Sequence, residues 1–263
     1  MIERVGFFQF VETYSDPLGE LAKCLERENV RNALIVLPEG FNLGREYNIN
    51  PCCKGQTREK PRFDAHCMLQ FLSGMAAARE GLRFVGAVID EYRRNCGYFI
   101  DGKNTPTLMC EKINSDGSCE YGPGKELQSE NPIEVGDLAI GTLICVDAFQ
   151  QVQPDEQGKR ANIRRQHLFD AFGASKCPKY LLCIPAYLTA DYLVPDWGKP
   201  EEEKEYWVVM ANSSRARESY MAVNGQKQDF PSSNRDQNVI RTVNFEPKSR
   251  YGADKGSITE SSR

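Results

Sequence analysis

The stretch Asp137-Leu-Ala-Ile-Gly-Thr-Leu-Ile-Cys145 is strongly apolar and predicts a buried strand that ends at a cysteine. A cysteine in this place, directly before a tight turn, has the geometry of a nucleophile elbow. Such an elbow lifts the side chain out of the sheet and can aim backbone N–H groups at an oxyanion. The alternative is a cysteine that is only part of the core, because Cys is often fully buried.

On both sides of this stretch, apolar strand-like runs alternate with amphipathic helical stretches, which predicts an α/β or layered α+β domain. We find no repeat, linker or low-complexity block, so we expect one domain over residues 1–250 and a solvated tail over 251–263. The other expected strands are 5–10, 33–37, 83–90, 96–100, 107–112, 180–185, 219–224 and 239–245, and the expected helices are 18–28, 65–81, 163–172 and 201–217.

Two more of these strands end in ionisable residues. Ile35-Val-Leu-Pro-Glu39 places a carboxylate at the mouth of a buried strand, where it suits a general base; a capping or salt-bridging glutamate is the alternative. Leu108-Met-Cys-Glu-Lys112 ends in a lysine that could hold an oxyanion or favour a thiolate, or could simply end the strand. Open α/β sheets carry their sites at the carboxyl ends of strands, so we expect the three residues to meet.

Together, the three strand ends resemble the signature of the nitrilase superfamily, the carbon–nitrogen hydrolases, in the order Glu, Lys, Cys. Pro38-Glu39 is similar to the general-base motif of that family, and Glu111-Lys112-Ile113-Asn114 to its lysine motif. Ile140-Gly-Thr-Leu-Ile-Cys145-Val-Asp147 is similar to the nucleophile motif. The resemblance covers residues 5–225 and includes Phe8-Gln9, Asn95-Cys-Gly-Tyr-Phe-Ile-Asp-Gly102, Ile184-Pro185-Ala186, Trp207, Arg215-Ala-Arg-Glu218 and Asn224.

The resemblance implies a four-layer αββα sandwich and a Glu-Lys-Cys triad. Glu39 would take the thiol proton of Cys145, which attacks a carbonyl or nitrile carbon. Lys112 and the backbone N–H of Val146 would stabilise the oxyanion, and Glu39 would then protonate the leaving amine and activate the hydrolytic water. The supporting glutamate of the family matches Glu120, with Glu126 as the alternative. The resemblance implies no metal or organic cofactor.

The residues after the cysteine indicate a branch of the family. Val146-Asp147-Ala148 resembles the amidase and carbamoylase branch, whereas nitrilases tend to carry Trp-Glu there. We therefore expect hydrolysis of an amide, ureido or carbamoyl C–N bond in a small molecule. A nitrile hydrolase and a catalytically silent binding or scaffold relative are the alternatives. A thiol redox protein is a third alternative. The absence of any CxxC pair argues against it.

The composition of the chain indicates which classes of partner and which cellular location to expect. A net charge of -4 over 263 residues, without a basic block, argues against a nucleic-acid partner. No apolar run is long enough to span a bilayer or to serve as a signal peptide, so we expect no membrane partner and a cytoplasmic location. With two histidines and no CxxC pair among ten cysteines, a zinc site is not expected. The family resemblance implies an amide-type substrate, water, and a homodimer or higher homo-oligomer.

Overall fold

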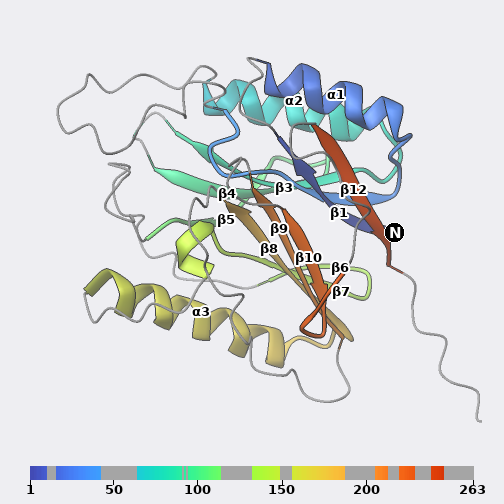
Figure 1. The fold of residues 1–263 in the computed structure, drawn as a ribbon. Helices are drawn as coiled ribbons and strands as arrows, with labels where there is room; N and C mark the ends of the chain where they lie inside the picture. The colour runs from blue at the N-terminus through green and yellow to red at the C-terminus, as the bar shows by residue number, and fades with distance from the viewer. Residues whose placement is uncertain are drawn as a thin grey trace, which may run out of the picture.

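The computed structural model describes residues 1–10, 16–42, 64–90, 92, 94–113, 132–148, 156–186, 205–212, 219–228 and 238–245. Two β-sheets lie face to face, as Figure 1 shows. Helices α1 (Pro17–Arg27) and α2 (Ala65–Ala77) cover the outer side of one sheet, and α3 (Glu156–Ala174) covers the outer side of the other. The predicted αββα layering is thereby confirmed.

The first sheet brings the ends of β2 and β5 to one edge. Its strand order is β12-β1-β2-β3-β4-β5. Strand β2 runs parallel to β3, and two antiparallel steps through β4 return β5 to the same direction. The residues that follow β2 and β5 therefore emerge where β4 begins. The strands are β1 (Arg4–Gln9), β2 (Ala33–Val36), β3 (Arg83–Ile89), β4 (Asn95–Ile100), β5 (Thr107–Glu111) and β12 (Val239–Asn244).

The second sheet has the order β11-β10-β9-β8-β7-β6, with three parallel strands, β7, β8 and β9, at its centre. Its outer strands pair antiparallel with their neighbours. Central strands of this kind are buried on both faces, which explains their almost unbroken apolar sequences. The strands are β6 (Ile133–Val135), β7 (Leu138–Thr142), β8 (Lys179–Ala186), β9 (Glu205–Asn212), β10 (Tyr220–Val223) and β11 (Gln226–Lys227).

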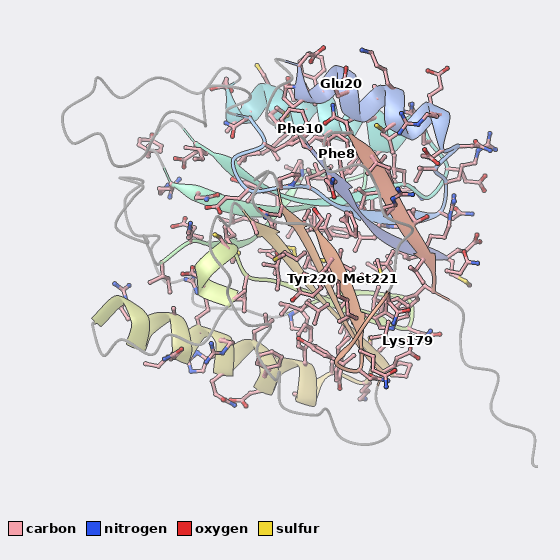
Figure 2. The ribbon with its side chains drawn as sticks, in the orientation of Figure 1. Phe8, Phe10, Glu20, Lys179, Tyr220 and Met221 are labelled. Atoms are coloured by element: carbon pink, nitrogen blue, oxygen red, sulfur yellow. The ribbon has the colours of Figure 1, made fainter. Side chains whose placement is uncertain are left out.

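Three apolar cores separate the four layers. The side chains of Phe8 and Phe10 lie between β1 and the helices α1 and α2 (Figure 2). A second core, with Trp207 and Met221, fills the space between the two sheets. The third lies between the second sheet and α3, and it contains Cys145. The alternation of a strand's side chains between its two faces assigns successive residues to different cores.

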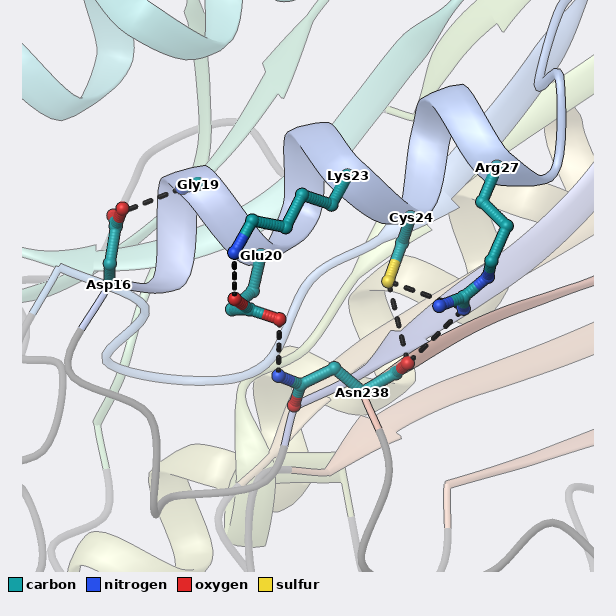
Figure 3. A network of polar contacts seen from close by, with 7 residues as sticks. All are labelled: Asp16, Gly19, Glu20, Lys23, Cys24, Arg27 and Asn238. Carbon is teal, nitrogen blue, oxygen red and sulfur yellow. Dashed lines mark hydrogen bonds and ion pairs between the residues drawn. The ribbon is translucent and has the colours of Figure 1, made fainter.

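Helix α1 shows how local sequence fixes the outer layer. Asp16 caps its N-terminus by accepting a hydrogen bond from the Gly19 N–H at 3.0 Å, and Pro17 occupies the first turn. Asn238, beside β12, donates from Nδ2 to Oε2 of Glu20 at 3.1 Å (Figure 3). The Cys24 thiol donates to the Asn238 carbonyl oxygen at 3.4 Å. These contacts tie the helix to the edge of the first sheet.

The prediction of a helix over residues 201–217 is wrong, because residues 205–212 form β9. The charged start of this segment favours a helix, but its apolar part is rich in aromatic and β-branched residues. All of them are buried between neighbouring strands, and this tertiary context decides the structure. Strand β7 ends at Thr142, earlier than expected, and β6 was not predicted. None of the helices in the described ranges is long and apolar enough to cross a membrane.

Gly141 allows α3 to pack closely against the strand that leads to Cys145. A Cβ atom at this position would lie 2.7 Å from Leu168 Cδ1 and 2.7 Å from Phe172 Cζ. Both side chains are buried, so they have little room to move. We expect Gly141→Ala to lower the free energy of unfolding by about 1–3 kcal/mol through overpacking. Urea denaturation tests this, and an unchanged midpoint would contradict the close packing. Gly173→Ala, where no atom lies within 4 Å of the added Cβ, is the control.

Candidate active site

Cys145 sits on a strained turn at the end of the β7 segment. It opens a short 3₁₀ helix, Cys145–Ala148, and its φ angle is +51°. Left-handed backbone costs a residue with a Cβ about 1–2 kcal/mol, so the surrounding structure must hold this conformation. The Leu143 N–H still pairs with the Cys183 carbonyl oxygen at 3.2 Å, which carries the sheet almost to the turn. The expected elbow is therefore present in the backbone.

Glu39 lies at the seam between the two sheets. Beyond β2, the Leu37 N–H donates to the Val85 carbonyl oxygen at 2.8 Å, which keeps the chain beside β3. The Glu39 N–H then donates to the carbonyl oxygen of Ala186, the last residue of β8 in the other sheet, at 3.4 Å. The side chain is only 2% exposed. A carboxylate that is this well buried needs partners for its charge.

Lys112 supplies the first of these partners. Its Nζ lies 2.6 Å from Glu39 Oε1, and both side chains are buried. The second partner is Asn95, whose Nδ2 donates to the same oxygen at 2.6 Å. The Asn95 carbonyl oxygen in turn accepts from the Lys112 N–H at 2.8 Å. The edge at which β2 and β5 end and β4 begins thus assembles a compact ionic site.

The charges around Lys112 keep it protonated. Burial alone would lower the pKa of Lys112, but the negative charges of Cys145, Glu39 and Asp147 and the hydrogen bond to Glu39 raise that pKa well above its usual value. Among these raising effects, the charge of Cys145 acts most strongly on the Lys112 ammonium. In return, a fixed cation beside a thiol favours the thiolate. Lys112 can therefore stabilise either a thiolate or an oxyanion at this place.

Asp147 connects the cysteine turn to the lysine strand. Its Oδ2 accepts from the Ile113 N–H at 2.6 Å, and its own N–H donates to the Ile144 carbonyl oxygen at 3.1 Å. From α3, the Arg164 guanidinium donates to the Glu111 carbonyl oxygen. The segment that carries Lys112 is therefore held on either side by backbone contacts. Such outer contacts fix the position of charged groups that must act together.

The structure brings Glu39 and Lys112 into direct contact, and Cys145 lies close enough to Lys112 to raise its pKa electrostatically. Val146 lies in the 3₁₀ turn directly after the cysteine, where its backbone N–H could serve an oxyanion. Glu120 and the alternative Glu126 lie outside the described residues.

Asn95, Asp147 and Arg164 had no predicted role of their own. Asn95 and Asp147 fall inside the motifs quoted above, and this was the signal that could have found them. Nothing in the sequence around Arg164 marks it. Within the ranges that the structure describes, no three His, Cys, Asp or Glu side chains are placed to hold a metal ion.

Comparison with known proteins gives matches in structure but not in sequence. No protein-family model and no curated protein sequence matches the chain. The crystal structure of an amidase from Nesterenkonia sp. matches with a TM-score of 0.59 and 14% identity, over 92% of this chain and 90% of that chain. A mutant of the Nesterenkonia AN1 amidase, described as from the nitrilase superfamily, matches with a TM-score of 0.58 and 14% identity over the same shares. The chain therefore has the fold of the nitrilase superfamily.

Proposed function

We propose that this chain is a hydrolase that cleaves an amide, ureido or carbamoyl C–N bond of a small molecule through a thioester on Cys145. The observation that carries the proposal is the buried Lys112–Glu39 pair, at 2.6 Å, beside a cysteine held on a left-handed turn. A buried ion pair and a strained backbone both cost free energy, and their coincidence beside a thiol is typical of a catalytic site.

The reaction begins with transfer of the thiol proton from Cys145 to Glu39. The thiolate attacks the carbonyl carbon, and the carbonyl oxygen becomes an oxyanion that Lys112 and the Val146 N–H stabilise. The C–N bond breaks as Glu39 returns the proton to the leaving nitrogen, which departs as ammonia or an amine. Glu39 then removes a proton from water, which attacks the thioester; the acid is released and the thiol is restored.

The solved relatives suggest which substrates to try first. A Glu-to-Gln mutant of the Nesterenkonia sp. AN1 amidase shows Michael addition of acrylamide at its active-site cysteine, and another structure shows covalent addition of the acetamide moiety of fluoroacetamide there. A cysteine mutant of the same amidase is in complex with butyramide. On this likeness, we propose short aliphatic amides as first candidates for this chain, ahead of ureido acids and nitriles.

A screen for ammonia release tests the proposal. Short amides, ureido acids and nitriles are incubated with the protein, and Cys145→Ala serves as the blank. Release from an amide or ureido compound by the wild type alone supports the proposed function, whereas release from nitriles alone favours the nitrile-hydrolase alternative. Absence of turnover, together with thiol alkylation that shows no preference for Cys145, would favour the silent binding or scaffold protein.

Glu39→Gln should lower kcat/KM by about 10²–10⁴-fold, because it removes the group that takes and returns the proton. The amide has nearly the same shape as the carboxylate, so the loss reports chemistry more than packing. Ammonia release measures the effect. Glu20→Gln, on α1 and away from the site, is the matched control and should retain the wild-type rate. Wild-type turnover by Glu39→Gln would exclude Glu39 as the base.

We further propose a cytoplasmic location and a homodimer or larger homo-oligomer. The location is supported by the cysteines: all seven in the described part of the chain are free thiols, as expected in a reducing compartment. The net charge of -4 fits a protein without a nucleic-acid partner. The oligomer rests on the resemblance to a family whose members commonly pair through elements near the nucleophile.

A further inference from the structure

The segment that carries Glu39 leaves β3 and then returns to it. Before it leaves, the Leu37 N–H donates to the Val85 carbonyl oxygen at 2.8 Å. After it returns, the Phe41 N–H donates to the Ala87 carbonyl oxygen at 3.3 Å. Two steps along β3 are thus matched by four along the passing segment, whereas a regular parallel ladder matches equal numbers. Extra residues of this kind, as in a β-bulge, re-aim a side chain and are frequent next to active sites.

The excursion, residues 38–40, reaches across to the second sheet. The Glu39 N–H donates to the Ala186 carbonyl oxygen at 3.4 Å, which is longer than a typical hydrogen bond of this type. Pro38 has no N–H with which to pair. Gly40 has a φ angle of +61°, a left-handed backbone that glycine adopts without strain and that turns the chain back. The excursion places the Glu39 carboxylate at the seam, but its own backbone contacts hold it only weakly.

Asn42 fixes the return of this segment to β3. Its Oδ1 accepts from the Ile89 N–H at 2.9 Å, and its Nδ2 donates to the Ile89 carbonyl oxygen at 2.8 Å. The side-chain amide thus pairs with both backbone groups of the last residue of β3, as a neighbouring strand would. We infer that Asn42 is a positioning residue, which holds the excursion and thereby sets where the Glu39 carboxylate stands. The inference rests on the proposed function, because it concerns the residue assigned as the base.

The alternative is that Asn42 only completes the hydrogen bonding at the end of β3, since buried backbone groups need partners. The geometry favours the further role. Asn42 is 0% exposed, and both of its bonds to Ile89 are shorter than the backbone contacts of Glu39 and Phe41 that precede them. The Phe41 ring also packs against Phe8, but apolar contacts are not directional. The amide therefore fixes the register in which the excursion closes, three residues after Glu39.

The test is a double-mutant cycle of Asn42→Leu and Glu39→Gln, measured as ammonia release from butyramide or another short amide that the wild type cleaves. Leucine has a similar volume but cannot pair with Ile89. Asn42→Leu should lower kcat by about 10–100-fold and leave KM nearly unchanged, because a displaced base slows proton transfer more than it weakens binding. In the Glu39→Gln background the base is already absent, so the same substitution should change kcat by less than about twofold.

Asn42→Ala replaces Asn42→Leu in the cycle if the leucine variant does not fold. The smaller side chain leaves room for a water molecule that can pair with both backbone groups of Ile89, and the expected loss of kcat is then about tenfold. An equal loss of kcat in the wild-type and Glu39→Gln backgrounds would mean that Asn42 does not act through Glu39. That result, or wild-type kcat in the folded Asn42 variant, would overturn the inference and leave the proposed function standing.

Asn238→Leu is the matched control. Asn238 is another buried asparagine, whose Nδ2 donates to Glu20 Oε2 at 3.1 Å, over α1 and away from the site (Figure 3). Its substitution should lower the urea midpoint, as Asn42→Leu should, but leave kcat at the wild-type value. An equal loss of kcat in both variants would overturn the inference. If the wild type releases no ammonia from any amide, ureido or carbamoyl compound, the proposed function fails and the inference fails with it.

Discussion

Cys145→Ala is expected to abolish hydrolysis while leaving the fold intact. The thiol is the atom that forms the proposed thioester, and loss of a catalytic nucleophile typically costs at least about 10⁴-fold in kcat. Alanine removes only the sulfur from a side chain that is already small, so the core behind the turn should close with little change. Ammonia release gives the rate, and thermal unfolding gives the stability.

A second substitution at Cys145 tests whether the backbone of the turn is strained. Alanine at φ +51° keeps the strain of the wild type, whereas glycine adopts this conformation readily. We therefore expect Cys145→Gly to be more stable than Cys145→Ala by about 1 kcal/mol, with both variants inactive. Turnover by either variant of a substrate that the wild type cleaves would exclude Cys145 as the nucleophile.

Lys112→Met is expected to impair both stability and catalysis. The substitution leaves the Glu39 carboxylate buried without the ammonium that lies 2.6 Å from it. Removal of one partner of a buried ion pair lowers the free energy of unfolding by about 3–5 kcal/mol. Loss of an oxyanion donor should also lower kcat by about 10²–10³-fold.

Lys179→Met is the matched control for this variant. Lys179 is another buried lysine, but it begins β8, at the end of the strand opposite to Ala186, and its Nζ lies 4.1 Å from the centre of the Phe245 ring (Figure 2). Its replacement should cost about 0.5–2 kcal/mol and leave the rate unchanged. Urea unfolding measures the stability of both variants, and ammonia release measures their rates. A Lys112→Met protein that matches the control in stability and in rate would contradict the assigned role.

The sequence predicts the layered fold and the positions of Glu39, Lys112 and Cys145 at the ends of buried strands. Apolar runs such as the one before Cys145 must be buried, and the residue after each run must then emerge at a sheet edge. The sandwich class and the contact between Glu39 and Lys112 follow from this pattern together with the family resemblance. A tight turn at Cys145 could be expected from its place at the end of an apolar strand, but the left-handed φ of +51° at the cysteine itself could not.

What the sequence does not predict depends on contacts between distant segments. Strand β9 looks helical from its charged start, and only its burial between β8 and β10 makes it a strand. Asn95 meets Glu39 because β4 begins at the edge where β2 and β5 end, a consequence of strand order that no local pattern carries. Arg164 reaches the Glu111 carbonyl oxygen only because α3 lies against β7 at Gly141.

The most direct test of the central claim is inactivation by 2-chloroacetamide, a short amide that also carries an alkylating carbon. Labelling of each cysteine is followed by peptide mass spectrometry, and ammonia release from a substrate amide is measured on the same samples. If Cys145 is the nucleophile, the fraction of labelled Cys145 and the fraction of lost activity should rise together to completion, ahead of labelling at the other cysteines. Full activity with Cys145 completely labelled, or full inactivation with Cys145 unlabelled, would contradict the account.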